Sequence, residues 1–242
     1  MANFDTNRLN QAGAQTGAVV DQGLRAYMLK VYNTMGLGLA LTGVAALGTA
    51  TLAANNPAFA QLIYASPLKW VIMLAPLAAV FFLSFRIQSM SLSAATTTFF
   101  VYAGILGVSL SSIFMVYTSA SIVQTFFITA ASFGALSLYG YTTKRDLTGM
   151  GSFLFMGLIG LMLAMVVNIF LVSSALQFVI SAAGVLIFAG LTAYDTQDIK
   201  NMYYEADDSD SMGKKALMGA LRLYLDFINM FMFLLQFLGN RE

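Results

Sequence analysis

Long apolar stretches separated by short polar segments dominate the pattern of the chain. Residues 87–143 form an uncharged run of 57 residues, and residues 147–194 form another of 48. One bilayer crossing takes about 20 helical residues, each rising roughly 1.5 Å. Each run is therefore too long for one crossing and predicts two helices joined by a short turn. We place these turns at residues 117–121 and 173–175.

The same reading over the whole chain predicts seven membrane-spanning helices. Backbone groups inside lipid must be hydrogen-bonded within their own segment, and continuous apolar runs lack the alternation of a barrel strand. We therefore expect an all-α membrane protein, with an N-terminal tail at residues 1–30 and a transmembrane domain at residues 31–242. The expected spans are residues 31–53, 68–87, 94–117, 121–141, 151–173, 175–195 and 216–238.

The distribution of Lys and Arg predicts the orientation, because cytoplasmic loops carry an excess of both. With the N-terminus inside, only Lys69 and Arg241 lie on the outer side. Nine basic residues lie on the inner side: Arg8, Arg25, Lys30, Arg86, Lys144, Arg145, Lys200, Lys214 and Lys215. We therefore expect a cytoplasmic N-terminus and a C-terminus outside.

Composition removes several classes of function. Charged residues make up 10% of the chain, against about 25% in soluble proteins. A net charge of +1 argues against a nucleic-acid partner, which needs a basic face. The absence of Cys excludes thiol chemistry, and the absence of His removes the usual general base and zinc ligand. We expect no cofactor, and any proton chemistry must come from carboxylates, Tyr or Lys.

Three ionisable residues lie in or at the ends of the expected spans. Asp226 lies inside the seventh span, Asp195 ends the sixth and Arg86 ends the second. An ionisable group inside a membrane is costly and is a functional candidate. Asp226 must be protonated, solvated or paired. Arg222, one turn earlier, is one possible partner, and a polar site that includes Asn229 on the same face is the alternative.

Asp195 and Arg86 also have simpler readings. Asp195 lies where the sixth span leaves the membrane, so it could be an ordinary interfacial carboxylate. Arg86 could anchor the second span at the lipid headgroups. The acidic segment that follows the sixth span, residues 205–210, could gather cations, although a solvated linker is the simpler interpretation.

Two motifs carry a resemblance to a known family. Tyr194-Asp195-Thr196-Gln197 ends the sixth span, and Leu223-Tyr224-Leu225-Asp226-Phe227-Ile228-Asn229 lies in the seventh. Their order, the seven spans and the size of the chain resemble a bacterial member of the Bax inhibitor 1 family, also called transmembrane Bax inhibitor motif proteins. The resemblance implies a location in the bacterial inner (plasma) membrane. It also implies six helices around a central seventh, with Asp195 paired to Asp226 on the cytoplasmic side.

The resemblance also implies a function, a pH-sensitive calcium leak across the membrane, with Arg86 close to the pair by position. Two neighbouring carboxylates cannot both ionise cheaply, so they share a proton and titrate as a unit. Loss of that proton would leave two repelling charges and favour opening. Ca²⁺ takes oxygen ligands, so Asp195 and Asp226 would be metal ligands, completed by Asn229, water or backbone carbonyls. The expected partners are lipid, calcium ions and protons.

Two other membrane functions fit the sequence less well. Intramembrane aspartyl proteases use two Asp residues on consecutive spans, but Gly-x-Gly-Asp and Pro-Ala-Leu elements are missing here. A retinal-binding protein needs a Lys in its last span, and residues 216–239 contain none. We therefore do not expect an enzyme. Some bacterial relatives are linked to membrane-protein quality control through a membrane-bound ATP-dependent protease. A protein of that kind would dock through its N-terminal tail and need no ion path.

Overall fold

The structure is a computed structural model that describes the backbone of residues 2–241 and the side chains of residues 22–241. Its helices are α1 (Ala2–Asn55), α2 (Pro57–Ala60), α3 (Leu68–Arg86), α4 (Leu92–Leu110), α5 (Ser119–Thr142), α6 (Thr148–Leu171), α7 (Ser174–Asn201) and α8 (Ser209–Leu238). Three short helical segments join them: η1 (Gln61–Ala65), η2 (Ile87–Ser89) and η3 (Ser111–Met115).

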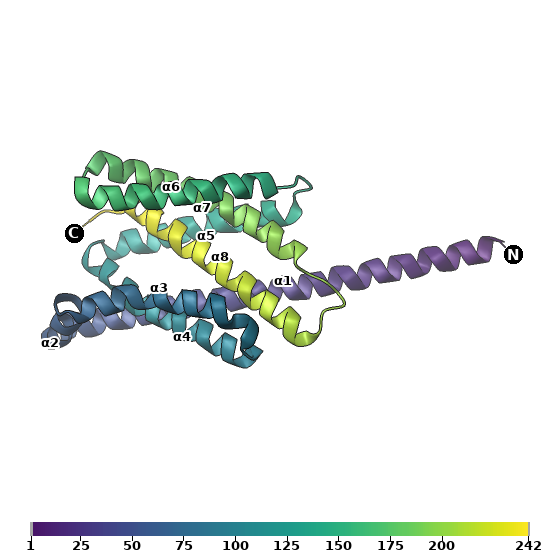
Figure 1. The fold of residues 1–242 in the computed structure, drawn as a ribbon, viewed down its shortest axis with the longest axis horizontal. Helices are drawn as coiled ribbons and strands as arrows, with labels where there is room; N and C mark the ends of the chain where they lie inside the picture. Colours follow the sequence, from purple (N-terminus) through teal and green to yellow (C-terminus); the bar gives the residue numbers. More distant parts are fainter. Residues whose placement is uncertain (1, 242) are drawn as a thin grey trace.

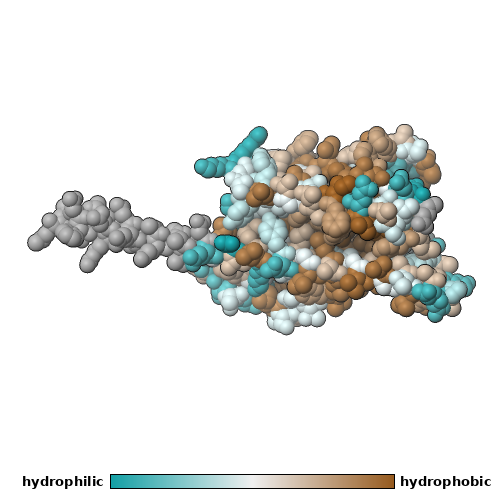
Figure 2. All heavy atoms as spheres, turned by 180° about the vertical axis from the view of Figure 1, so that it is seen from behind, coloured by the Kyte–Doolittle hydropathy of each residue, from teal (hydrophilic) through white to brown (hydrophobic). Residues whose placement is uncertain are grey.

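Seven of these helices are long and apolar enough to cross a membrane, namely all except the short α2. The predicted all-α class and the seven spans are therefore confirmed, and the chain is a multi-pass membrane protein. The side-chain surface agrees with this, because hydrophobic residues cover the middle of the bundle and hydrophilic ones gather toward its ends (Figure 2). Phe85 and Phe170 are 80% and 81% exposed, an arrangement that suits contact with lipid.

The helices run further than the apolar stretches alone indicate. The apolar pattern ends the sixth span at residue 195 and begins the seventh at 216, whereas α7 continues to Asn201 and α8 begins at Ser209. Apolar composition marks the part of a helix that fits lipid, while backbone hydrogen bonding continues until a cap or turn interrupts it. With 30 residues, α8 is about 45 Å long, and it crosses the bundle obliquely (Figure 1).

The start of α1 also differs from the pattern. The helix is continuous through residue 30, and Tyr27 and Met28 are already buried in the core. The side chains of residues 1–21 lie outside the described part of the chain. The boundary between tail and transmembrane domain at residue 30 therefore stays a prediction.

The seventh span, α8, lies at the centre of the bundle, as the family resemblance implies. In its most apolar window 67% of the residues are buried, against 6% to 33% in the other six spans. It packs against α1, α4, α5 and α7, while α3 packs outside on α4 and α6 packs outside on α7. Figure 1 shows α8 passing between the α1, α3 and α4 group and the α5, α6 and α7 group.

Short polar side chains set where several helices begin. Ser91, Thr118, Ser173 and Asp208 each precede a helix and accept a hydrogen bond from the backbone N–H three residues later. These contacts satisfy N–H groups that the first helical turn leaves without a partner.

A buried hydrogen-bond cluster connects the central helix to two neighbours. The hydroxyl groups of Tyr224 on α8 and Thr42 on α1 lie 2.6 Å apart, and Thr42 also donates toward the carbonyl of Ala103 on α4 at 3.0 Å. Tyr224 is fully buried, with Phe99 and Tyr102 packed edge-on against its ring. Lipid is as apolar as the helix surfaces, so the hydrophobic effect does not drive membrane helices together. Hydrogen bonds between buried polar groups therefore help to fix how the helices pack.

Close backbone packing between α5 and α7 supplies a stability test. A Cβ atom at Gly140 would lie 2.2 Å from the carbonyl oxygen of Ala193, while one at Gly134 on the same helix would meet nothing within 4 Å. We expect Gly140→Ala to destabilise the protein by about 1–3 kcal/mol through overpacking, and Gly134→Ala to cause no loss. Thermal unfolding in detergent, followed by circular dichroism, measures both. Equal melting temperatures for the two variants would contradict the tight α5–α7 contact.

Candidate functional site

The predicted acidic residues of the last two spans lie together in the interior. Asp195 is on α7, six residues before the helix ends, and Asp226 is near the middle of α8. The two residues are only 7% and 5% exposed. Their pairing needs the sixth span to continue beyond Asp195, and α7 does continue to Asn201.

The two carboxyl groups lie within hydrogen-bonding reach of each other. Ionised carboxylates only accept hydrogen bonds, so a bond between them needs one proton. Asp226 Oδ2 is buried and accepts no hydrogen bond from the described side chains and backbone. This oxygen is therefore satisfied only when the pair shares a proton or when another group donates a hydrogen bond to it.

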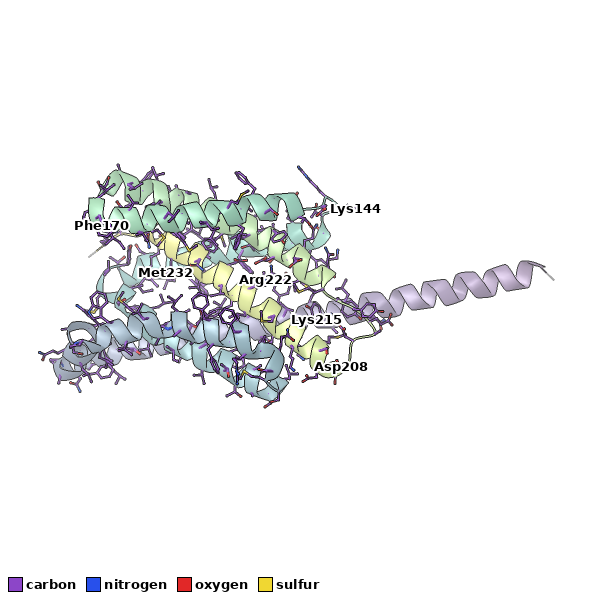
Figure 3. The ribbon with its side chains drawn as sticks, in the orientation of Figure 1. Lys144, Phe170, Asp208, Lys215, Arg222 and Met232 are labelled. Carbon is purple, nitrogen blue, oxygen red and sulfur yellow. The ribbon has the colours of Figure 1, made fainter. Side chains whose placement is uncertain are left out.

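Arg222 is the cation at this site. Its Nη2 lies 2.9 Å from Asp195 Oδ1, and its Nη1 lies 2.5 Å from Asp198 Oδ2. One guanidinium on α8 thus bridges two carboxylates that are almost one turn apart on α7. Figure 3 labels Arg222 on α8. This two-pronged geometry is the one that suits Arg rather than Lys.

The role of Arg222 was not found from the sequence. Its spacing from Asp226 favours a pair within α8, whereas the ion pairs in the described part of the chain join it to α7. One feature of the sequence does point to this role: Asp195 and Asp198 are three residues apart, which places two carboxylates on one face of α7. An Arg on the next helix is the natural partner for such a face.

Arg86 is not brought to the pair. It ends α3, is exposed, and takes part in none of the ion pairs found among residues 22–241. The helix that carries it packs on α4, at the periphery of the bundle. In this structure the position expected for Arg86, beside the carboxyl pair, belongs to Arg222.

Asn229 does lie with the pair, as its spacing predicts. Its side-chain amide donates to the Leu225 carbonyl at 2.8 Å, which leaves its own side-chain oxygen available. It lines the same cavity as Asp195, Asp226 and Arg222.

Each residue of the Tyr194–Gln197 motif faces a different neighbour. The ring of Tyr194 covers Gly151 on α6, where a Cβ atom would come within 2.6 Å of it. The hydroxyl of Thr196 lies 3.0 Å from that of Ser137 on α5. Gln197 holds the α5–α6 loop, since it accepts from the Leu147 N–H and donates to the Arg145 carbonyl, both at 2.8 Å. The motif therefore places Asp195 by fixing α7 against α5 and α6 as well as α8.

A cavity of about 800 Å³ lies against the pair, between α6, α7 and α8. Asp195, Arg222, Asp226 and Asn229 form its polar part. The remaining wall is largely apolar and consists of Gly151, Ser152, Phe155, Met156, Leu158, Leu161, Met162, Met165, Phe188, Leu191, Tyr194, Leu225 and Phe233.

Comparison with known proteins adds the family. The model of a family described as inhibitor of apoptosis-promoting Bax1 matches residues 24–242. The chain belongs to the Bax inhibitor-1 family. It is 51% identical to protein RP147 of Rickettsia prowazekii over 222 residues, 92% of each chain. It is 49% identical to the inner membrane protein YbhL of Escherichia coli, over 91% of this chain and 94% of the relative. The resemblance drawn from the two motifs is thereby confirmed.

In this Bax inhibitor-1 family protein the acidic segment after α7 is engaged locally. Lys215 pairs with Asp207 at 2.6 Å, and Lys214 pairs with Asp210 at 2.9 Å. Asp208 caps α8, and hydrogen bonds from Ser211 hold the pKa of its carboxyl group below the ordinary value. No cluster of three or more Asp, Glu, His or Cys residues with metal-binding geometry occurs among residues 22–241. A bound cation would depend on Asp195, Asp226 and neutral oxygen donors.

The Arg222 bridge makes a testable contribution to stability. Arg222→Gln leaves the buried Asp195 without its cation, and we expect a loss of about 1–3 kcal/mol. Adding Asp195→Asn should recover much of this loss, because the unpaired charge is then gone. Asp210→Asn, at a residue whose side chain is 51% exposed in its pair with Lys214, should cost less than about 1 kcal/mol. Unfolding in detergent measures all three. If the losses in unfolding free energy of Arg222→Gln and Asp195→Asn simply added in the double variant, the coupling between Arg222 and Asp195 would be contradicted.

Proposed function

We propose that this protein is a pH-sensitive calcium leak of the bacterial inner membrane, gated by the carboxyl pair of Asp195 and Asp226. Its N-terminus is cytoplasmic and its C-terminus outside. The observation that carries the proposal is the contact of two buried carboxyl groups across the interface of α7 with the central helix. A family relative, YbhL, is an inner membrane protein, which supports the location.

The shared proton closes the gate in this proposal. With one proton the two carboxyl groups attract each other and hold α7 against α8. Without it, two negative charges face each other in surroundings of low dielectric constant, where their repulsion is stronger than in water. The chain has no His, so a carboxyl pair is a suitable group to sense a modest change in pH.

Arg222 makes the two carboxylates unequal. It holds Asp195 and Asp198 through one guanidinium, so Asp195 has a partner whether or not the shared proton is present. Asp226 has no such partner among the described residues. Loss of the proton therefore acts mainly on Asp226, and the change is transmitted to the central helix that carries it.

In this proposal, a calcium ion crossing the membrane is bound transiently by side-chain oxygens at this site. Asp226 and the free side-chain oxygen of Asn229 face one cavity and suit a hard cation, with water completing its shell of six to eight ligands. Arg222 competes for Asp195, so a passing ion would be held weakly. Weak binding suits conduction, because an ion that binds tightly cannot leave.

Calcium flux into liposomes tests this proposal. We expect the flux of the wild-type protein to rise with pH, by up to roughly tenfold per unit for loss of a single proton. Asp226→Asn cannot form two repelling charges and should give a low flux that is independent of pH. Asp210→Asn, which changes an exposed carboxylate of the α8 end, should behave as the wild type.

Two outcomes would contradict the proposal at different levels. A pH dependence that persists in Asp226→Asn would remove the carboxyl pair as the gate. No flux above that of empty liposomes at any pH would remove the leak itself and favour the quality-control function. In that case, deletion of residues 1–21 should abolish capture of the membrane-bound protease, while Asp226→Asn should leave capture intact.

A further inference from the structure

The cavity beside the carboxyl pair has a lateral, lipid-facing wall. Three methionines of α6 line it, Met156, Met162 and Met165, and they are 64%, 50% and 43% exposed. Their helix packs on α7 and has no extensive contact with α8, so the cavity occupies the space between α6 and α8. In a bilayer this wall adjoins the acyl chains, and a molecule dissolved in lipid could enter without crossing water.

The two ends of the cavity differ in polarity. Tyr194, Asp195, Arg222 and Asp226 lie at one end, where the Tyr194 ring covers the beginning of α6. The apolar part of the lining includes the methionines and the rings of Phe188 and Phe233, which are stacked at a centroid distance of 5.9 Å. The cavity is thus an apolar chamber with one charged end.

Passage of an inorganic ion does not account for the apolar part of this chamber. Ca²⁺ takes oxygen ligands, which the cavity offers mainly at its charged end, whereas most of the wall offers carbon and sulfur. A volume of about 800 Å³ lies within the range of pockets that hold drug-sized molecules, which are mostly apolar with a few placed polar groups. Methionine side chains adapt to ligands of varied shape.

The charged end of the cavity favours a positively charged ligand. Two carboxylates and one guanidinium line the cavity, and the guanidinium is shared with Asp198, so this end is net negative when the lining acids are ionised. Arg222 already occupies Asp195 Oδ1, while Asp226 Oδ2 is buried and has no partner within the described part of the structure. A ligand that donates a hydrogen bond from a positively charged group would complete it.

We propose that the cavity between α6, α7 and α8 binds lipophilic amines from the bilayer. The ammonium group donates to Asp226 in place of the proton that the carboxyl pair otherwise shares. Tyr194 lines the same cavity. The apolar part of the amine lies along Met156, Met162 and Met165. This site stands on the cavity and its charge and does not depend on calcium transport.

Photolabelling in lipid nanodiscs tests the proposal, with a dodecylamine analogue that carries a diazirine in its chain. We expect saturable labelling of α6 peptides that contain Met156 to Met165. Unlabelled dodecylamine should compete, while dodecanol, which has the same chain and no charge, should compete roughly tenfold less well because it lacks a charge-assisted hydrogen bond.

Two variants and one control locate the site. Asp226→Asn should weaken saturable labelling roughly tenfold by removing the charged acceptor. Met162→Trp, which adds bulk to the wall and leaves the carboxyl pair untouched, should reduce it as well. Met73→Trp on lipid-facing α3, at a residue that is 57% exposed, should have no effect.

Other results would overturn the proposal. Labelling that never saturates and is as strong on α3 as on α6 means that the amine is only dissolved in the lipid. Equal competition by dodecanol and dodecylamine means that the charge plays no part. Should Asp226→Asn fail to fold, the comparison of the two competitors on the wild-type protein and the Met162→Trp variant still decide the question. Calcium flux is not measured, so failure here leaves the proposed leak untouched.

Discussion

The bridge from Arg222 to Asp195 and Asp198 is the interaction on which the interior of this bundle depends. A carboxylate on a helix surrounded by apolar side chains is tolerated only when a counter-charge or a proton accompanies it. Arg222 supplies that charge from the central helix, at 2.9 Å and 2.5 Å. It ties α7 to α8 at the level where Thr196 and Gln197 tie α7 to α5 and the α5–α6 loop. The position of one acid is thereby fixed from three sides.

The sequence predicts the fold through a simple constraint, since only helices can satisfy the backbone inside lipid. The long uncharged runs predict the seven spans. They do not predict the helix ends, because α7 and α8 continue into polar segments that no longer suit lipid. The central place of α8 was available only through family resemblance. A physical signal for it does exist: α6 has the highest mean hydropathy of the seven spans and is the least buried, while α8 is among the least apolar and is the most buried. In a membrane the most apolar helix faces the solvent, which is lipid, and the polar groups gather inside.

The site was only partly predictable for a geometric reason. Helical spacing shows which residues share a face, so it placed Asn229 with Asp226. It does not show how one helix is rotated against the next, and a long guanidinium can reach a neighbouring helix as easily as its own next turn. The sequence therefore offered Asp226 as the partner of Arg222, where the structure has Asp195 and Asp198. For Arg86, the position along the chain indicates how deep the residue lies in the membrane. It does not indicate where its helix lies around the bundle, and α3 packs on α4, away from the carboxyl pair.

The asymmetry of the carboxyl pair connects the two proposals made for this protein. Because Arg222 already satisfies Asp195, that acid acts as a fixed part of the α7–α8 interface. Asp226 is left as the group whose partner can change, and one of its oxygens faces no donor in the described structure. A proton, a calcium ion and an ammonium group are all positive and could each complete it, but only one at a time. Whatever occupies Asp226 then excludes the others, so proton binding, ion passage and amine binding at this cavity would be mutually competitive.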